Sequence, residues 1–248
     1  MAQAVSTRGP VTGTAAAGKK RRKLFLLDLY STAVGKKYVM ALTGIALMGY
    51  VLAHMIGNLK MFLGADEINH YGEFLRELLV PLAPRTVVLW MLRIGLIGAA
   101  ILHVHAAYSL TVLNREARAV KYQSERDYQA ANFASRTMRW TGVIVLLFVL
   151  WHLADLTWGW ANPDFVRGDP YNNVVASLSR VPVAILYVVA NIALGIHLYH
   201  GAWSLFQSMG WNSPRFNRWR RGFAIAFATA ITVGNVSFPL AVQAGIVG

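Results

Sequence analysis

The histidines are the residues of this sequence best suited to chemistry. Six of the seven fall inside long apolar runs: His54, His103, His105, His152, His197 and His200. Ionisable groups are costly to keep at membrane depth and usually mark a functional site there. Neutral imidazole binds zinc, copper or iron, and it can also relay protons. Because each of the first four apolar runs contains a histidine, we interpret the set as ligands rather than as isolated core residues.

The composition indicates an integral membrane protein. Hydrophobic residues make up 56% of the 248 residues and charged residues only 14%, which is too apolar for a soluble domain. Cysteine is absent, so the chain cannot form a disulfide or hold an iron–sulfur cluster with its own sulfur atoms. The net charge of +13 comes from clusters between the apolar runs, which argues for membrane topology signals and against nucleic-acid binding.

Five apolar runs approach the ~20 residues needed to cross a bilayer. A spanning segment must satisfy its own backbone hydrogen bonds, so each run is predicted to be a helix. The predicted fold is all-α, with one transmembrane domain over residues 24–248 after a flexible basic tail over residues 1–23. The predicted spans cover residues 38–62, 86–113, 140–160, 181–207 and 223–247, and Pro239 is expected to kink or end the last one.

The basic residues predict the orientation of the chain. With the N-terminus inside, 18 of the 24 Lys and Arg residues lie on the cytoplasmic side, as the positive-inside rule requires, and the C-terminus lies outside. The residues after the basic cluster are predicted to form an interfacial lead-in, and the outer connection around Ile68 and Tyr71 a short amphipathic surface helix. The inner stretch 114–139 is either a docking surface for a cytoplasmic partner or a solvated loop.

Depth along the helices sorts the histidines into two layers. At a rise of ~1.5 Å per residue, His54 and His152 lie about 9 and 12 Å from the outer ends of their spans. His103 and His197 lie deeper, at about 25 to 27 Å. Two pairs of imidazoles on antiparallel helices suit two iron porphyrins with two axial histidines each, which favours electron transfer over oxygen chemistry. We therefore predict a haem-binding four-helix bundle plus a fifth helix.

His105 and His200 compete for the inner layer. A porphyrin needs a shallow wall, and the residues on the same helix faces within two turns of His103 and His197 are small: Ala99, Ala100, Ala106, Ala107, Ala190, Ala193, Gly201 and Ser204. His105 and His200 are therefore expected to hydrogen-bond a propionate or a ligand ring, or simply to pack. For the outer pair the small-residue signal is only Gly57 beside His54.

Two other kinds of site fit the pattern less well. A proton relay or transporter would pair intramembrane carboxylates with the rings, and only Asp155 lies close to a histidine, one turn beyond His152. A zinc site would show a His pair at i, i+4 or an HExxH motif, and the sequence contains neither.

Four stretches of the chain resemble a known family. They read HMIGNLKMFLGADEINHYGEFL, LHVHAAYSL, NREARAVKY and GIHLYHGAWSLFQSMGWNSPR. They are similar to the five-helix, di-haem cytochrome b558 membrane-anchor subunit of succinate:quinone oxidoreductases and fumarate reductases. The similarity covers nearly all of the chain after the N-terminal tail.

The resemblance implies an anchor that holds two b haems and docks a flavoprotein subunit and an iron–sulfur subunit. FAD, succinate and the clusters would belong to those partners. The family's four axial ligands correspond to His54 and His152 on the outer haem and to His103 and His197 on the inner one. The expected location is a bacterial cytoplasmic membrane, where electrons would reach a quinone, expected to be menaquinone. An oligomer of the whole complex is compatible with this prediction.

In the family the quinone pocket is expected near the outer haem, where a carboxylate can deliver protons from outside. The candidates here are Glu73, Asp155 and, as a hydrogen-bond donor, Asn58, although each could equally be an ordinary interfacial residue. Arg93, a few turns into the second span, is expected to neutralise a haem propionate.

Three alternatives stay open at this point. The chain could be a haem-free structural anchor whose histidines only form hydrogen bonds, or the cytochrome b anchor of another respiratory dehydrogenase. One histidine pair could also ligate a cluster together with cysteines of a partner chain.

Overall fold

The computed structural model describes residues 25–117, 133–211 and 213–248, which are almost entirely α-helical and contain no strand. Five helices are long and apolar enough to span a membrane. They are α2 (Ala33–Asn58), continued by the 3-10 helix η1 (Leu59–Leu63), α4 (Val87–Glu116), α5 (Phe133–Leu156), α7 (Val181–Ser208) and α8 (Pro214–Gln243). The predicted all-α fold with five spans is confirmed.

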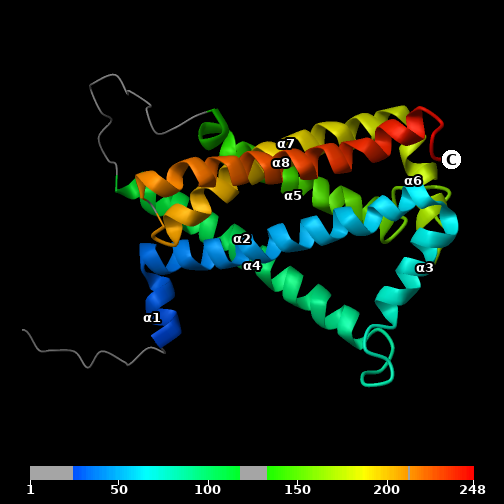
Figure 1. Cartoon of the computed structure of the whole chain (residues 1–248). Coiled ribbons are helices and arrows are strands. Elements are labelled where there is room, and N and C mark those ends of the chain that lie inside the picture. The colour runs from blue at the N-terminus through cyan, green and yellow to red at the C-terminus, as the bar shows by residue number, and fades with distance from the viewer. Residues whose placement is uncertain (1–24, 118–132, 212) are drawn as a thin grey trace, which may run out of the picture.

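The spanning helices pack as two pairs (Figure 1). α2 packs against α4, and α5 packs against α7. The two pairs meet where α2 contacts α7, while α8 covers α7 and also touches α2. α4 is inclined to the other long helices and diverges from them toward its N-terminal end. The arrangement is thus a four-helix group with α8 on its outside.

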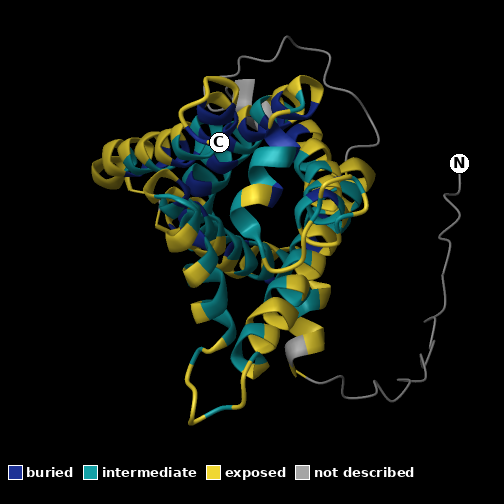
Figure 2. Cartoon of the chain, turned by 90° about the vertical axis from the view of Figure 1, so that its right-hand side faces the viewer, coloured by how far each residue is buried: buried dark blue, intermediate teal, exposed yellow. Residues whose placement is uncertain are grey.

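Glycines allow α8 to approach its neighbours closely. A Cβ atom at Gly195 of α7 would lie 2.1 Å from Thr232 Oγ1, and one at Gly234 of α8 would lie 2.0 Å from Met55 Sδ. Small residues at helix crossings give membrane helices their close packing. Beside these contacts, Ile231 is completely buried. Figure 2 shows the complementary pattern, in which the outward faces of the helices are mostly exposed.

Two short helices cover the end of the group at which α5 ends and α7 begins. α3 (Ala65–Arg76) is the predicted surface helix, and α6 (Pro170–Leu178) was not predicted. Asn69 joins them, because its Nδ2 donates to Asp169 Oδ1 at 3.1 Å and its Oδ1 accepts from the Tyr171 amide at 3.1 Å. The Asp-Pro pair that begins α6, an N-cap followed by proline in the first turn, is the sequence signal for this helix.

The stability contributed by Asp169 should depend on pH. Hydrogen bonds from Asn172, its side chain first, hold the pKa of Asp169 below its ordinary value of 3.8. Its contribution is therefore present above that value and is lost as pH falls through the lower folded-state pKa. We expect Asp169→Ala to lower the free energy of unfolding by about 1 kcal/mol at pH 7.

Denaturant titrations in detergent at pH 7 and at acid pH would check this prediction. Asp169→Asn is the matched control, because it retains a capping side chain but cannot titrate. It should lose less stability than the wild type on acidification. Equal acid losses in the wild type and in Asp169→Asn would contradict the assignment.

Several helices differ in extent from the predicted spans. The first span begins at Ala33, because Thr32 Oγ1 caps it by accepting from the Gly35 amide at 2.9 Å. The third ends at Leu156, four residues early, and the fifth begins at Pro214, nine residues early. Pro239 does not end the fifth span, since α8 continues to Gln243. Apolarity marks the part of the chain that can lie in hydrocarbon, and it does not register where a helix begins or ends.

The predicted interfacial lead-in coincides with the helix α1 (Phe25–Ser31), and its place at the membrane surface stays a prediction. The basic tail (1–23) and most of the inner stretch 114–139 lie outside the described residues.

Candidate functional site

The two outer histidines meet between the helix pairs. His54 on α2 and His152 on α5 have ring centroids 5.9 Å apart, with an angle of 75° between the ring planes. Metal–imidazole bonds of about 2 Å on opposite sides of one metal ion would put two ring centroids about 6 Å apart. The outer pair is therefore spaced as two axial ligands of one metal centre would be.

Each outer histidine uses its Nδ1 atom for a hydrogen bond. His54 Nδ1 lies 3.1 Å from Asn58 Nδ2, the amide end that Asn58 turns toward the ring. His152 Nδ1 lies 3.3 Å from the Tyr187 hydroxyl. Tyr187 donates its own proton to Asp155 Oδ2 at 2.8 Å, so its oxygen accepts from His152 Nδ1–H. The lone pair of His152 Nε2 is thereby free to bind a metal.

The inner histidines lie against matching Thr-Gly pairs. Thr43 Oγ1 of α2 is 3.2 Å from His103 Nδ1, and a Cβ atom at Gly44 would lie 3.5 Å from the ring carbon Cε1 of His103. On α5, Thr141 Oγ1 is 3.4 Å from His197 Nδ1. The glycines leave room for the two rings against the neighbouring helix.

A threonine hydroxyl sets the tautomer of each inner histidine. Thr43 donates to the main-chain oxygen atoms of Val39 and Met40, and Thr141 donates to those of Thr137 and Met138. Each hydroxyl oxygen is thus an acceptor for Nδ1–H, which leaves Nε2 as the metal-binding atom.

The donor set fits a cofactor with two axial positions better than a metal ion caged by the protein. Within residues 25–117, 133–211 and 213–248, no three His, Cys, Asp or Glu side chains converge on one point. The donors instead come in pairs, with one histidine from the α2/α4 pair and one from the α5/α7 pair. A haem bound at either layer would therefore link the two helix pairs.

Comparison with known proteins gives one family. A model of the succinate dehydrogenase/fumarate reductase transmembrane subunit matches residues 113–236, which is half of the chain. The chain belongs to this family. No curated protein and no solved structure matches it. The protein is thus a multi-pass membrane subunit of a succinate dehydrogenase or fumarate reductase complex, which implies catalytic partner subunits.

A repeated pattern in the transmembrane subunit marks residues that the sequence prediction missed. The first and third spans both contain Met-x-x-Thr-Gly followed, ten residues after the glycine, by histidine, at residues 40–54 and 138–152. The repeat supplies the outer histidine and the Thr-Gly pair that faces an inner histidine. Tyr187, Ser177 and Arg180 were also missed, and only the folded contacts reveal them.

The residues predicted to contact quinone occupy different surroundings in the subunit. Asn58 lies beside His54. Glu73 is on α3, where it pairs with Arg76 and Arg85. Asp155 has 0% of its surface exposed and is enclosed by donors of its own chain, so it presents no surface to a quinone.

Four further residues that the sequence pointed to lie near the histidines or at the surface: His105, His200, Arg93 and Gly57. His105 is exposed and its Nδ1 lies 2.5 Å from the Tyr30 hydroxyl, so it ties α1 to α4. His200 is an electrostatic neighbour of His197. Arg93 is exposed, with its guanidinium 5.1 Å from the ring centroid of Trp90. Gly57 does not form a wall beside His54 as predicted, because a Cβ atom there would meet the Tyr71 ring at 2.6 Å.

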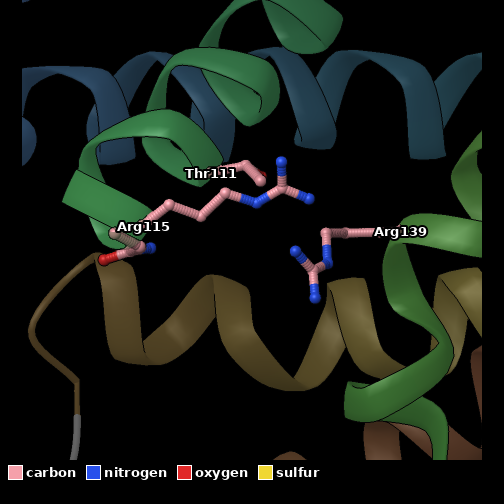
Figure 3. A pocket seen from close by; sticks show the side chains of 4 residues that line it. Thr111, Arg115 and Arg139 are labelled. Atoms are coloured by element: carbon pink, nitrogen blue, oxygen red, sulfur yellow. The ribbon is translucent and has the colours of Figure 1, made fainter. Parts of the chain in front are cut away.

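A polar pocket lies at the other end of the subunit. It has a volume of about 570 Å³ and is lined, among the described residues, by Thr111, Asn114, Arg115 and Arg139. The side chains of Arg115, from α4, and Arg139, from α5, extend toward one another (Figure 3). Two converging guanidinium groups favour an anionic partner at this end of the bundle.

Proposed function

We propose that this transmembrane subunit is the electron conduit of its complex and that it holds two b haems. His54 and His152 would hold the outer haem, and His103 and His197 the inner one. The observation that supports this most directly is the pairing of His54 with His152 at 5.9 Å, across helices that do not belong to the same packed pair. When bound, two such haems would supply one-electron transfer between the two sides of the membrane.

The chain's own residues would orient the ligands and insulate them. Thr43, Thr141 and Tyr187 accept Nδ1–H and so leave the Nε2 lone pair of each histidine free to bind iron. His54 would do the same if Asn58 presented its Oδ1 atom to Nδ1–H in the loaded subunit. The apolar faces of α4 and α5 would exclude water from the reduced cofactor.

Quinone, which we propose to be menaquinone, would bind near the outer pair. Asn58 is suited to donate a hydrogen bond there, and Glu73 at the outer surface is suited to deliver protons. We propose a different role for Asp155, because its carboxylate is enclosed. Arg93 lies near Tyr50, which contacts His54, so the proposed pairing of Arg93 with a propionate concerns the outer haem.

The opposite end would face the soluble subunits. We propose that the N-terminus is cytoplasmic in a bacterial inner membrane and that the flavoprotein and iron–sulfur subunits dock at the inner end. Arg115 and Arg139 give that end a positive charge suited to an acidic partner surface. Both FAD and the iron–sulfur clusters would remain on the partners.

Adding succinate to the purified complex tests the proposed function. We expect a b-type α band to appear in the reduced-minus-oxidised spectrum and to decay when a menaquinone analogue is added. A complex that oxidises succinate without any b-type band would contradict the proposal and favour the haem-free structural anchor. The family assignment already argues against an anchor of an unrelated dehydrogenase.

Variants of Gly44 in the same complex test whether this glycine makes room for the inner ligand His103. Gly44→Val should push the His103 ring off Thr43, because a Cβ atom already lies in contact with the ring at 3.5 Å. We expect weaker or shifted bands of the inner haem only. Gly49→Val is the matched control on α2, since nothing lies within 4 Å of a Cβ atom there. Identical spectra for both variants would contradict the predicted contact.

A further inference from the structure

A buried ionic cluster lies directly behind one outer histidine. Asp155 follows His152 by one turn of α5 and has no exposed surface. Its Oδ1 accepts from Arg180 Nη2 at 2.8 Å, and its Oδ2 accepts from the Tyr187 hydroxyl at 2.8 Å and from Ser177 Oγ. These donors come from α6, from the start of α7 and from α7 itself. Two further elements, α6 and α7, therefore converge on a single carboxylate of α5.

The hydrogen bonds of this cluster run in one direction. Because Tyr187 gives its proton to Asp155, its oxygen must accept from His152 Nδ1–H, 3.3 Å away. The contacts of the Tyr187 ring hold it in place, since it lies edge-on to Phe148 with a centroid distance of 5.0 Å. The carboxylate thus reaches the histidine through one fixed hydroxyl group.

The other histidines lack an equivalent carboxylate among the described contacts. Thr43 and Thr141, which accept from the inner histidines, donate to neutral main-chain oxygen atoms. His54 faces the neutral amide of Asn58. Among the described contacts, His152 is therefore the one proposed ligand whose hydrogen-bond acceptor is itself bonded to a carboxylate.

We propose that Asp155, Tyr187 and Arg180 form a positioning relay that orients His152 and lowers the reduction potential of the outer haem relative to the inner one. This inference rests on the proposed function. A hydroxyl that donates to a carboxylate is a stronger acceptor, and a stronger acceptor at Nδ1 makes Nε2 a more basic ligand. A more basic axial ligand stabilises the oxidised iron, which lowers the potential. Arg180, 2.8 Å away, is the charge partner of the buried Asp155 carboxylate.

A redox titration of the purified complex, followed optically and by EPR, tests the relay. In Asp155→Asn the outer haem should become about tenfold easier to reduce at equilibrium, a shift of ~59 mV to more positive potential for one electron. The reduction potential of the inner haem should not change. The low-spin EPR signal of the outer haem should also move, because it depends on the angle between the imidazole planes, 75° here. Asp164→Asn, in the exposed connection after α5, is the matched control and should match the wild type.

Tyr187→Phe provides a second, independent variant. It removes the hydroxyl that links His152 to the cluster but leaves the contacts of Asp155 with Arg180 and Ser177. It should shift the outer potential in the same direction, even if Asp155→Asn fails to assemble. An unchanged outer potential in Tyr187→Phe, with both haems bound, would overturn the relay and leave the conduit proposal intact. A wild-type complex without haem would instead overturn the proposed function itself.

Discussion

Replacing His197 by alanine is expected to remove the inner haem and leave the outer one bound, halving the haem content of the complex. Alanine has no ligand atom to take the place of the His197 Nε2 atom. The outer layer should be unaffected. On α5, Thr141 faces His197 and His152 lies 11 residues further on, so the layers are roughly 16 Å apart along the helix.

The matched control for this prediction is His200→Ala, one turn further along α7. It should retain both haems, because we assign no iron to His200. Haem quantification of the purified complexes, with the stoichiometry of the soluble subunits as the check on assembly, would decide the question. Retention of both haems in His197→Ala would contradict the ligand assignment. Loss of a haem in His200→Ala but not in His197→Ala would contradict it as well.

A second large effect is expected at Arg180. In Arg180→Met the buried carboxylate of Asp155 loses its charge partner. Breaking a buried ion pair costs about 3–5 kcal/mol, and we expect about 3 kcal/mol because a third of the Arg180 side chain is exposed. Arg180 also donates to the Ala161 carbonyl at 2.8 Å, so the connection after α5 should loosen. Denaturant titration in detergent would measure the loss.

Two comparisons distinguish the ion pair from general damage. Arg167→Met, at an exposed position of the same connection, should change the free energy of unfolding by less than about 0.5 kcal/mol. Combining Arg180→Met with Asp155→Asn should recover part of the loss, because no uncompensated charge is then buried. If Arg180→Met is as stable as Arg167→Met, the pair contributes little to the fold.

Much of the architecture could be predicted from the sequence because the membrane imposes it. Apolar length and the need for internal hydrogen bonds predict five helices, and the depth of His54 and His152 predicts the contact that the structure shows. The helix ends were predicted less well. Thr32 and Pro214 begin helices through capping and first-turn geometry, which an apolarity pattern does not register.

The residues around the proposed ligands could not be predicted from the sequence, and the reason is physical. Asp155, Ser177 and Tyr187 come together only when α5, α6 and α7 pack, and neither spacing nor composition encodes that meeting. Asp155 therefore appeared to be an open carboxylate, although it is enclosed. The Thr-Gly pairs were in principle visible, since the spacing to histidine is repeated in the first and third spans.

The most direct test of the central claim is the number and type of haems in the purified complex. A pyridine haemochrome assay and low-spin EPR would report both. We predict two b haems per transmembrane subunit, each with two histidine ligands. A complex that is fully assembled and oxidises succinate, but contains no haem b, would contradict the claim.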